Sequence, residues 1–351
     1  MSEHVIIFIQ AYNAAETLNR AIESILNQTN NNFTLYVLDN GSLDDTRTVI
    51  MNYAGRDNRI IPMIRDKNHL LDTDKTLPLI TFIDQIKFQY PSSCYFVNLD
   101  ADDEYSVDFL EKMIDFVTEN NLDIATCGTD WIDEKSGKII KHKLLEKNII
   151  LDGQDFAEQF PIYRNFMVTV WGGVYSLELL QKCDLVWLRN AKYFTDTAFC
   201  MEAFRRSKRA GVLAESLHRY YISPKTVSNQ FNTDWFQECK YLHNISVEFL
   251  LDYGEISKQN QDYLDVLFLI LIKYILPRIQ GASIDLSEKL KSLNEIFSDD
   301  MTRHILRYWD EVGIYSNKDE FLYEIKEWIT MQDGWEKEYS TVENIISSMN
   351  V

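Results

Sequence analysis

The first 130 residues alternate between short apolar runs of strand length and longer segments with helical periodicity. Residues 5–11 form a continuous apolar run, residues 18–26 place apolar side chains at helical spacing, and residues 33–39 repeat the strand pattern. The alternation continues with expected strands at 59–64, 94–99 and 122–126 and expected helices at 75–88 and 107–117. This pattern is typical of an α/β domain. We therefore predict a mostly parallel sheet flanked by helices.

Polar residues before the first two expected helices have the spacing of helix caps. Asn13 and Glu16 precede the first helix, and Ser42 and Asp45 precede the second. An oxygen-bearing side chain at this position accepts a hydrogen bond from backbone N–H groups that lack a partner inside the helix. We predict that these residues cap the two helices.

The pattern changes after residue 130. Residues 133–147 are rich in charge and are expected to form a hairpin or an excursion, after which strand and helix signals return at 168–180 and 195–211. From about residue 234 onward, every segment has helical periodicity. We predict an α/β domain at 1–232 and an all-α domain at 233–351.

The longest apolar run lies in this helical part, at residues 266–276. It is too short to span a bilayer and contains Lys273, so we expect a buried helix and no transmembrane segment. The N-terminus lacks the basic region of a signal peptide. These observations favour a cytoplasmic protein, with peripheral association at the inner face of the membrane as a further option.

The charge balance excludes some classes of partner. The chain has 35 Lys and Arg residues against 54 Asp and Glu residues, a net charge of −19. Such a chain repels nucleic acid and anionic lipid unless a local basic patch compensates, so we expect no nucleic-acid partner. Its five cysteines are widely spaced and contain no Cys-x-x-Cys pair, which argues against a disulfide framework and favours a reducing compartment.

The most informative motif is Asp100-Ala101-Asp102-Asp103, which follows an apolar strand. Ligands of open α/β sheets bind at the carboxyl ends of the strands. Two carboxylates on one turn can hold Mg²⁺ or Mn²⁺ together with substrate phosphates. The alternative is a solvated acidic cluster before a helix, which the helix dipole favours.

The other strand ends are also polar. The first runs into Gln10-Ala11-Tyr12-Asn13 and the second into Asp39-Asn40-Gly41-Ser42, followed by Asp44 and Thr46. Together with the aspartate motif, these segments resemble the family 2 glycosyltransferases of the GT-A fold, over about residues 4–230. The chain lacks the G-x-G-x-x-G and G-x-x-x-x-G-K-[ST] motifs of other nucleotide-binding folds. The resemblance implies a Rossmann-like, mostly parallel sheet, here followed by the all-α domain.

The resemblance also implies roles for individual residues, beginning with the donor nucleotide. The expected nucleotide contacts are Gln10, Ala11, Tyr12, Asp39, Asn40, Lys75, Asp100 and Arg219. Asn40 replaces the family's usual Asp, but an amide can still pair with a base. Tyr12 could instead be a core aromatic, Asp39 could instead cap its loop, and Lys75 could instead be solvated.

The remaining roles concern the metal, the acceptor and the general base. The resemblance assigns Asp102 as the direct metal ligand, with Asp100 and His218 beside it. Asp103, Trp171, Gly172 and Gly173 are expected near the acceptor sugar, although Asp103 could hold its loop and Trp171 could be buried. Asp196 is expected to be the general base, with an N-cap of the following helix as the alternative.

The function implied by the resemblance is inverting transfer of a sugar from a nucleoside-diphosphate sugar, most simply a UDP-sugar, with Mn²⁺ or Mg²⁺. The expected acceptor is a hydroxyl of a glycan, a lipid-linked or a protein-linked molecule in cell-envelope glycan biosynthesis. The alternative is a non-catalytic nucleotide-sugar or carbohydrate-binding protein that retains the fold. The helical domain could recognise the acceptor, form a homo-oligomer, or dock on a partner or a membrane.

Overall fold

The computed structural model describes residues 3–69, 77–185, 188, 195–222, 234–309 and 318–349. Contacts divide the chain into two compact units, 1–223 and 224–351. The boundary expected near residue 232 falls within residues 223–233, which lie outside the described residues.

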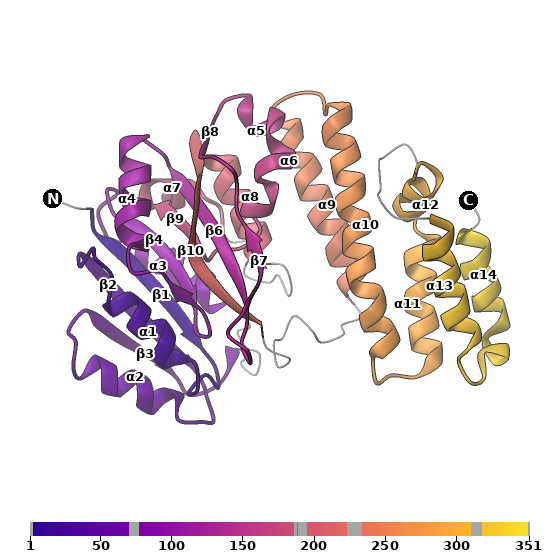
Figure 1. The fold of residues 1–351 in the computed structure, drawn as a ribbon, viewed down its shortest axis with the longest axis horizontal. Coiled ribbons are helices and arrows are strands. Elements are labelled where there is room, and N and C mark those ends of the chain that lie inside the picture. The colour runs from indigo at the N-terminus through magenta and orange to yellow at the C-terminus, as the bar shows by residue number, and fades with distance from the viewer. Residues whose placement is uncertain are drawn as a thin grey trace. The chain divides into compact units, whose positions relative to one another are not determined.

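The first unit is built on one sheet flanked by helices (Figure 1). Its strands are β1 (Val5–Ala11), β2 (Phe33–Asn40), β3 (Ile60–Arg65), β4 (Tyr95–Asp100), β5 (Glu104–Tyr105), β6 (Ile124–Asp133), β7 (Ile139–Lys143), β8 (Ile149–Asp152), β9 (Gly173–Ser176) and β10 (Arg209–Ile222). Its helices are α1 (Leu18–Leu26), α2 (Thr46–Ala54), α3 (Pro78–Ile86), α4 (Phe109–Glu119), α5 (Asp155–Glu158), α6 (Phe160–Tyr163), α7 (Leu177–Lys182) and α8 (Thr195–Arg206), with a 3₁₀ turn at Arg164–Phe166.

The strand order is β3-β2-β1-β4-β9-β6-β10-β5, with β7 paired to β6 and β8 paired to β10. The pairs β1·β2, β1·β4 and β2·β3 are parallel, as is β6·β10. Strand β9 runs antiparallel to both of its neighbours. The predicted fold class is confirmed, and the charged segment 133–147 contains the turn and second strand of the antiparallel hairpin β6–β7.

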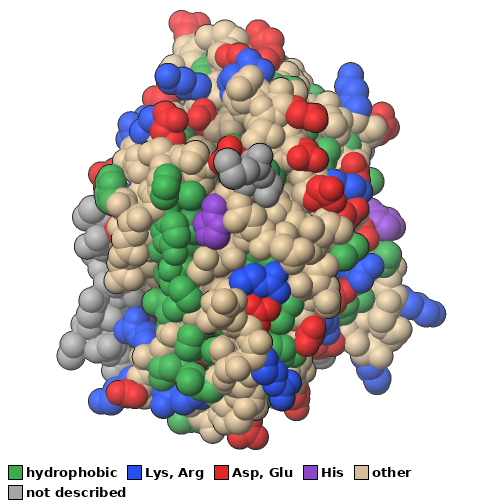
Figure 2. Space-filling model, turned by 90° about the vertical axis from the view of Figure 1, so that its left-hand side faces the viewer, with side chains coloured by type: hydrophobic (Ala, Val, Ile, Leu, Met, Phe, Trp, Pro, Cys, Tyr) green, Lys and Arg blue, Asp and Glu red, His purple; other side chains and the backbone are tan. Residues whose placement is uncertain are grey.

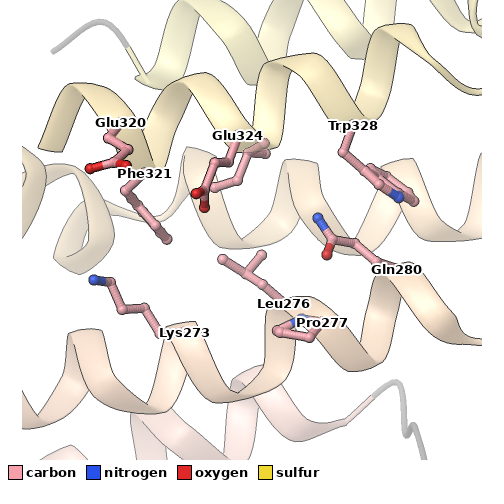
Figure 3. Close-up of a pocket in the computed structure, with 9 residues that line it drawn as sticks. Lys273, Leu276, Pro277, Gln280, Glu320, Phe321, Glu324 and Trp328 are labelled. Carbon is pink, nitrogen blue, oxygen red and sulfur yellow. The ribbon is translucent and has the colours of Figure 1, made fainter. Parts of the chain in front are cut away.

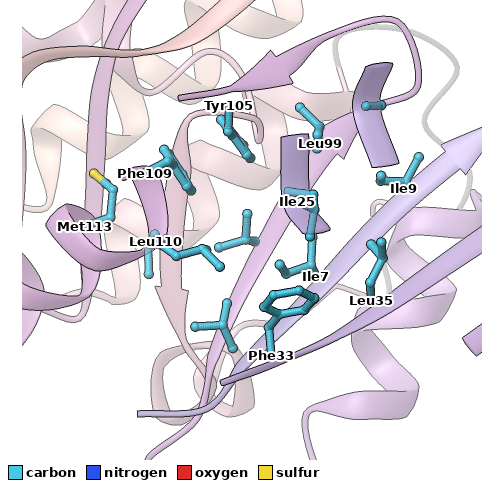
Figure 4. Packing of buried hydrophobic residues seen from close by; sticks show 14 of the residues in the cluster. Ile7, Ile9, Ile25, Phe33, Leu35, Leu99, Tyr105, Phe109, Leu110 and Met113 are labelled. Atoms are coloured by element: carbon cyan, nitrogen blue, oxygen red, sulfur yellow. The ribbon is translucent and has the colours of Figure 1, made fainter. Parts of the chain in front are cut away.

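Both faces of the sheet are buried, which explains why the first strand is apolar throughout. Ile7 and Leu35 belong to a core cluster on one face, where Ile25 of α1 and Leu110 of α4 converge on them (Figure 4). Alternate side chains of a strand point to opposite faces. Phe8 accordingly stacks on Phe82 of α3 at 4.3 Å between ring centroids.

The second unit is helical throughout its described residues. It contains α9 (Trp235–Leu251), α10 (Lys258–Gly281), α11 (Leu286–Ser298), α12 (Asp300–Arg307), α13 (Lys318–Thr330) and α14 (Tyr339–Met349), with a 3₁₀ turn at Trp335–Glu338. Its core joins apolar residues of all six helices, including Phe268, Leu293 and Ile329. Among the described helices, none has the length and apolar character needed to cross a bilayer.

Candidate functional site

The carboxyl ends of three neighbouring parallel strands meet at one edge of the first unit's sheet. Ala11 at the end of β1 is in register with Asp39 of β2, and Gln10 is in register with Asp100 of β4. The polar ends of β2 and β4 therefore lie on either side of the end of β1. This is the kind of edge where open α/β sheets bind ligands.

The loops after β1 and β2 are joined by hydrogen bonds. The backbone N–H of Asn13 donates to Oγ of Ser42 at 3.0 Å, and Oδ1 of Asn13 accepts from the backbone N–H of Leu43 at 2.8 Å. The predicted caps are therefore wrong: α1 and α2 begin without a side-chain cap hydrogen bond from their N-cap residues, Thr17 and Asp45. Asn13 and Ser42 bind the neighbouring loop instead and join the two strand ends at the sheet edge.

Asp39 and Asn40 are both buried, and both are engaged within the protein. Asp39 accepts from the backbone N–H of Ser42 at 2.8 Å and from Nε of Arg47 at 3.0 Å. Nδ2 of Asn40 lies 2.8 Å from Nδ1 of His69. Burial lowers the pKa of His69, so the neutral ring can accept a hydrogen bond from the amide. This contact explains why an amide suits position 40.

The residues expected around the nucleotide base differ in exposure. Ala11 is buried, Gln10 is half-buried, and Tyr12 is 44% exposed, which excludes the alternative that Tyr12 is a core aromatic. Lys75 lies outside the described residues. An exposed aromatic ring beside a sheet edge is available to stack on a ligand.

An acidic cluster consisting of Asp100, Asp102 and Asp103 lies at the end of β4. One carboxylate oxygen from each residue lies within 4.8 Å of the others. Burial raises the pKa of all three, and mutual repulsion contributes: Asp103, Asp196 and Asp102 further raise the pKa of Asp100. Carboxylates this close repel one another when ionised. A hard divalent cation prefers oxygen ligands and would compensate that repulsion.

Within this cluster Asp103 is fully buried and holds the local structure. Its Oδ1 accepts from the backbone N–H of Tyr221 at 3.0 Å, and its Oδ2 lies 3.2 Å from Nε2 of His218. These contacts favour the loop-holding role of Asp103 over a contact to an acceptor. Burial lowers the pKa of His218 to about 3, so the imidazole is neutral and retains a lone pair that a metal could use.

Arg20 on α1 is a site residue that the sequence analysis did not identify. Its guanidinium donates to the backbone carbonyl of Asp102, stacks 3.6 Å above the ring centroid of Tyr221, and lies 3.6 Å from Glu134. It therefore orients the loop that carries the acidic cluster. No sequence pattern marked Arg20 as a site residue, because an arginine on the polar side of a helix is ordinarily solvated.

The segment expected near the acceptor is packed against the same region. Trp171 is 7% exposed and stacks on His218 at 4.3 Å between centroids, in agreement with the alternative that it is buried. Gly172 has φ +72° and donates its backbone N–H to the hydroxyl of Tyr105 at 2.9 Å. A side chain at Gly173 would lie 2.8 Å from the ring of Tyr175. The backbone conformation thus favours glycine at position 172, and internal packing favours it at position 173, whatever else these residues contact.

Asp196 is brought to this region from a distant part of the sequence. It lies in the first turn of α8 as its second residue, and its charge contributes to the raised pKa of Asp100. Burial raises the pKa of Asp196 itself to about 6. A carboxylate with a pKa near neutrality is suited to take a proton from a hydroxyl group.

Two further basic residues, Arg219 and Lys143, lie close to residues of the site. Nη1 of Arg219 lies 2.6 Å from Oε1 of Glu104, so this expected nucleotide contact is paired within the protein. Lys143 of β7 was not expected at the site; its Nζ lies 4.8 Å from the ring centroid of Trp171. Burial lowers the pKa of Lys143 to about 8.

A separate groove lies in the helical unit, between α10 and α13 (Figure 3). Its volume is about 540 Å³. Leu276 and Gln280 reach into it from one helix, and Phe321, Glu324 and Trp328 from the other. The lining combines apolar and polar side chains, and it belongs to a different unit from the acidic cluster.

The fold and site together define a GT-A transferase domain, and comparisons with known proteins agree. The chain resembles the solved structure of S. aureus TarS 1–349 in complex with UDP, with a TM-score of 0.62, 12% identity, and coverage of 99% of this chain and 90% of TarS. At this identity the likeness shows the fold.

The family is identified at the sequence level. The model of glycosyl transferase family 2 matches residues 6–174. The uncharacterized glycosyltransferase EpsJ of Bacillus subtilis is 23% identical over 311 residues, covering 87% of this chain and 86% of EpsJ. The cholesterol galactosyltransferase of Borreliella burgdorferi is 23% identical over 318 residues, covering 83% and 84%. The family model covers most of the first unit, and together the comparisons support a family 2 glycosyltransferase of the GT-A fold.

Proposed function

We propose that the protein transfers a sugar, with inversion, from a nucleoside-diphosphate sugar to an acceptor hydroxyl. The observation that carries this proposal is the meeting of Asp196 with the acidic cluster, because it combines a candidate base with candidate ligands for a cation. The donor is most simply a UDP-sugar, in agreement with the UDP and UDP-GlcNAc complexes of TarS, which has the same fold.

Asp102 and Asp100 are the residues that would hold Mn²⁺ or Mg²⁺, with His218 close by. A bound divalent cation would neutralise the charge that develops on the leaving diphosphate. Arg20 contributes by fixing the backbone of Asp102, and Asp103 contributes by fixing the loop to β10. The donor nucleotide would lie along the ends of β1 and β2, beside Gln10 and Tyr12.

Asp196 would act as the general base in a single displacement. In its ionised form it accepts the proton of the acceptor hydroxyl as the oxygen attacks the sugar carbon from the side opposite the diphosphate. A pKa of about 6 leaves it mostly ionised at neutral pH while keeping it basic enough to accept that proton. Inversion follows from one displacement without a covalent sugar intermediate.

The acceptor class rests on the names of relatives. One is a cholesterol galactosyltransferase, and another, GgaA of Bacillus subtilis, is a minor teichoic acid biosynthesis protein with 24% identity over 241 residues. We therefore propose a lipid-linked or glycan acceptor in cell-envelope biosynthesis, reached from the cytoplasmic side. We further propose a catalytic domain at 1–232 and a helical domain at 233–351 that serves acceptor recognition or homo-oligomer formation.

The competing function is nucleotide-sugar binding without turnover. It is favoured by the engagement of Asn40, Asp39 and Arg219 within the protein, which reduces the number of free groups for a donor. The raised pKa of Asp196 argues against it, because a binding protein has no need for a buried base.

A ligand screen followed by a turnover assay tests the proposal. Nucleoside-diphosphate sugars with Mn²⁺ should raise the melting temperature of the intact protein, since a ligand that binds the native state stabilises it. The stabilising donor should then release free nucleoside diphosphate, slowly to water and faster with an acceptor. Stabilisation without any release would favour the binding protein, and no stabilisation by any donor would contradict both functions.

A further inference from the structure

The hairpin β6–β7 and the loop that follows it carry a concentration of positive charge that the proposed function does not use. Residues 135–147 contain five lysines and one glutamate in a chain of net charge −19. We define the lysine patch as Lys135, Lys138, Lys141 and Lys147, all of which are exposed. Figure 1 shows β7 beside β6, with which it pairs outside the main strand order of the sheet.

Three acidic residues near the lysine patch have contacts outside it. Oδ1 of Asp133 accepts from the backbone N–H of Ser136 in the turn at 2.7 Å, and Glu134 lies 3.6 Å from Arg20. Oδ1 of Asp130 lies 2.7 Å from Nδ1 of His142. In the part of the chain that the structure describes, none of the four patch lysines has a carboxylate within 4.0 Å. Their charge is therefore available to a partner.

Apolar side chains are exposed between these lysines. Ile139, Ile140 and Leu144 are 48%, 58% and 47% exposed. A lipid interface accommodates both kinds of side chain, because apolar groups enter the acyl boundary while the ammonium groups of lysines reach the lipid headgroups. A soluble polyanion would satisfy the lysines and leave the isoleucines in water.

We propose that the β6–β7 hairpin docks the protein on an anionic lipid surface. The net charge of −19 does not prevent this, because at physiological ionic strength charges more than about 8 Å from the surface are largely screened. Pairing of β7 with a second copy is disfavoured, since lysines on an exposed strand oppose edge-to-edge association. The face shown in Figure 2 intersperses acidic and basic side chains.

The docked hairpin would bring the transferase site to the membrane. Its last residue, Lys143, contacts Trp171, which stacks on His218 beside the acidic cluster. A lipid-linked acceptor would then reach the site by lateral diffusion. This consequence rests on the proposed function, whereas docking itself requires neither donor nor acceptor.

Vesicle sedimentation of the full chain tests the docking. The wild type should sediment with vesicles of phosphatidylcholine mixed with phosphatidylglycerol and remain in solution with phosphatidylcholine alone. Each lysine near an anionic surface contributes about fivefold to binding, so the variant Lys135→Gln, Lys138→Gln, Lys141→Gln, Lys147→Gln should bind more than about 100-fold more weakly. Equal binding of this variant and the wild type would overturn the proposal.

A matched variant separates local from overall charge. Lys208→Gln, Lys258→Gln, Lys291→Gln, Lys337→Gln removes four exposed lysines elsewhere, with the same change in net charge, and should bind as the wild type does. Equal losses in the two variants would contradict a local site. If the patch variant fails to fold by circular dichroism, the pair Lys135→Gln, Lys138→Gln at the turn replaces it, with an expected loss of about 25-fold.

The apolar contribution separates lipid from a soluble polyanion. Ile140→Ser should weaken vesicle binding severalfold, whereas Leu251→Ser, which changes a residue of similar exposure in the helical unit, should not. Polyphosphate binding with no effect of Ile140→Ser on vesicle binding would replace lipid by a soluble polyanion. Vesicle binding without turnover would retain the docking and reject the proposed function.

Discussion

Two charged regions of the first unit, the acidic cluster and the lysine patch, differ in burial. The acidic cluster is held by buried contacts, and burial raises the pKa of its carboxyl groups. The lysine patch lies on an exposed hairpin and the loop after it, and its four side chains are exposed. A buried charge requires a specific partner at short range, whereas an exposed charge acts through its number and position.

This difference predicts two kinds of response to substitution. A single change in the buried region should abolish a defined chemical step. A single change in the exposed region should have a small effect that adds to those of its neighbours.

The largest effect is expected for Asp196→Asn. The amide cannot accept a proton at neutral pH, so the transfer rate should fall by roughly two to four orders of magnitude. Nucleotide and metal affinity should remain almost unchanged. The measurement is kcat with a saturating donor and acceptor, with Asp115→Asn on the surface of α4 as the control. Full activity of a folded Asp196→Asn protein would exclude this residue as the base.

The next effect concerns Asp102 and the divalent cation. Removing one ligand should weaken Mn²⁺-dependent binding of a nucleoside diphosphate by about 100-fold, because the diphosphate then faces the remaining carboxylates without compensation. Calorimetric titration of wild type and Asp102→Asn, each with Mn²⁺ and with EDTA, measures this loss. Equal affinity of the wild type in both buffers would contradict the metal assignment.

Strands β1, β2 and β4 were predictable because burial on both faces requires apolar runs of strand length. The observed bounds of β1 are those expected, and β2 extends the expected strand by Asn40. The caps were not predictable from local spacing. Asn13 adopts a positive φ of 50° and binds the loop after β2, a contact that exists only because β1 and β2 are adjacent in the sheet.

In the candidate site, too, a local motif predicted some residues, whereas others are placed only by tertiary packing. The motif at the end of β4 predicted Asp100 and Asp102 directly, since it stands at the end of an apolar strand. Asp196 and His218 required the resemblance, because their positions depend on how α8 and β10 pack. Arg20 was missed, since its contact to Asp102 spans 82 residues.

The third prediction is the pH dependence of turnover. Asp196 acts as a base only when ionised, and burial raises its pKa to about 6. The rate should therefore be nearly constant above this pH and fall by about tenfold per pH unit below it. A cation on the acidic cluster favours the ionised form, so the midpoint with saturating Mn²⁺ should lie at or below about 6. A rate that rises as the pH falls from 7 to 5 would contradict the base assignment.

The smallest effect is expected within the hairpin itself, where Lys143 is half-buried and Lys141 is exposed. Burial lowers the pKa of Lys143 to about 8, whereas an unfolded lysine has a pKa of about 10.4. Between these two values the unfolded chain binds one more proton than the folded chain, so this group makes the protein more stable as the pH rises.

Lys143→Met should remove that contribution and, at pH 7.5, raise the free energy of unfolding by about 1 to 2 kcal/mol, a range reduced to allow for partial solvent screening. Urea unfolding at pH 7.5 and 9.5 measures both effects, with Lys141→Met as the control that should change neither. A loss of stability in Lys143→Met at pH 7.5 would mean that the ammonium group is stabilised at its half-buried position, and the contrast between buried and exposed charge would not hold for this lysine.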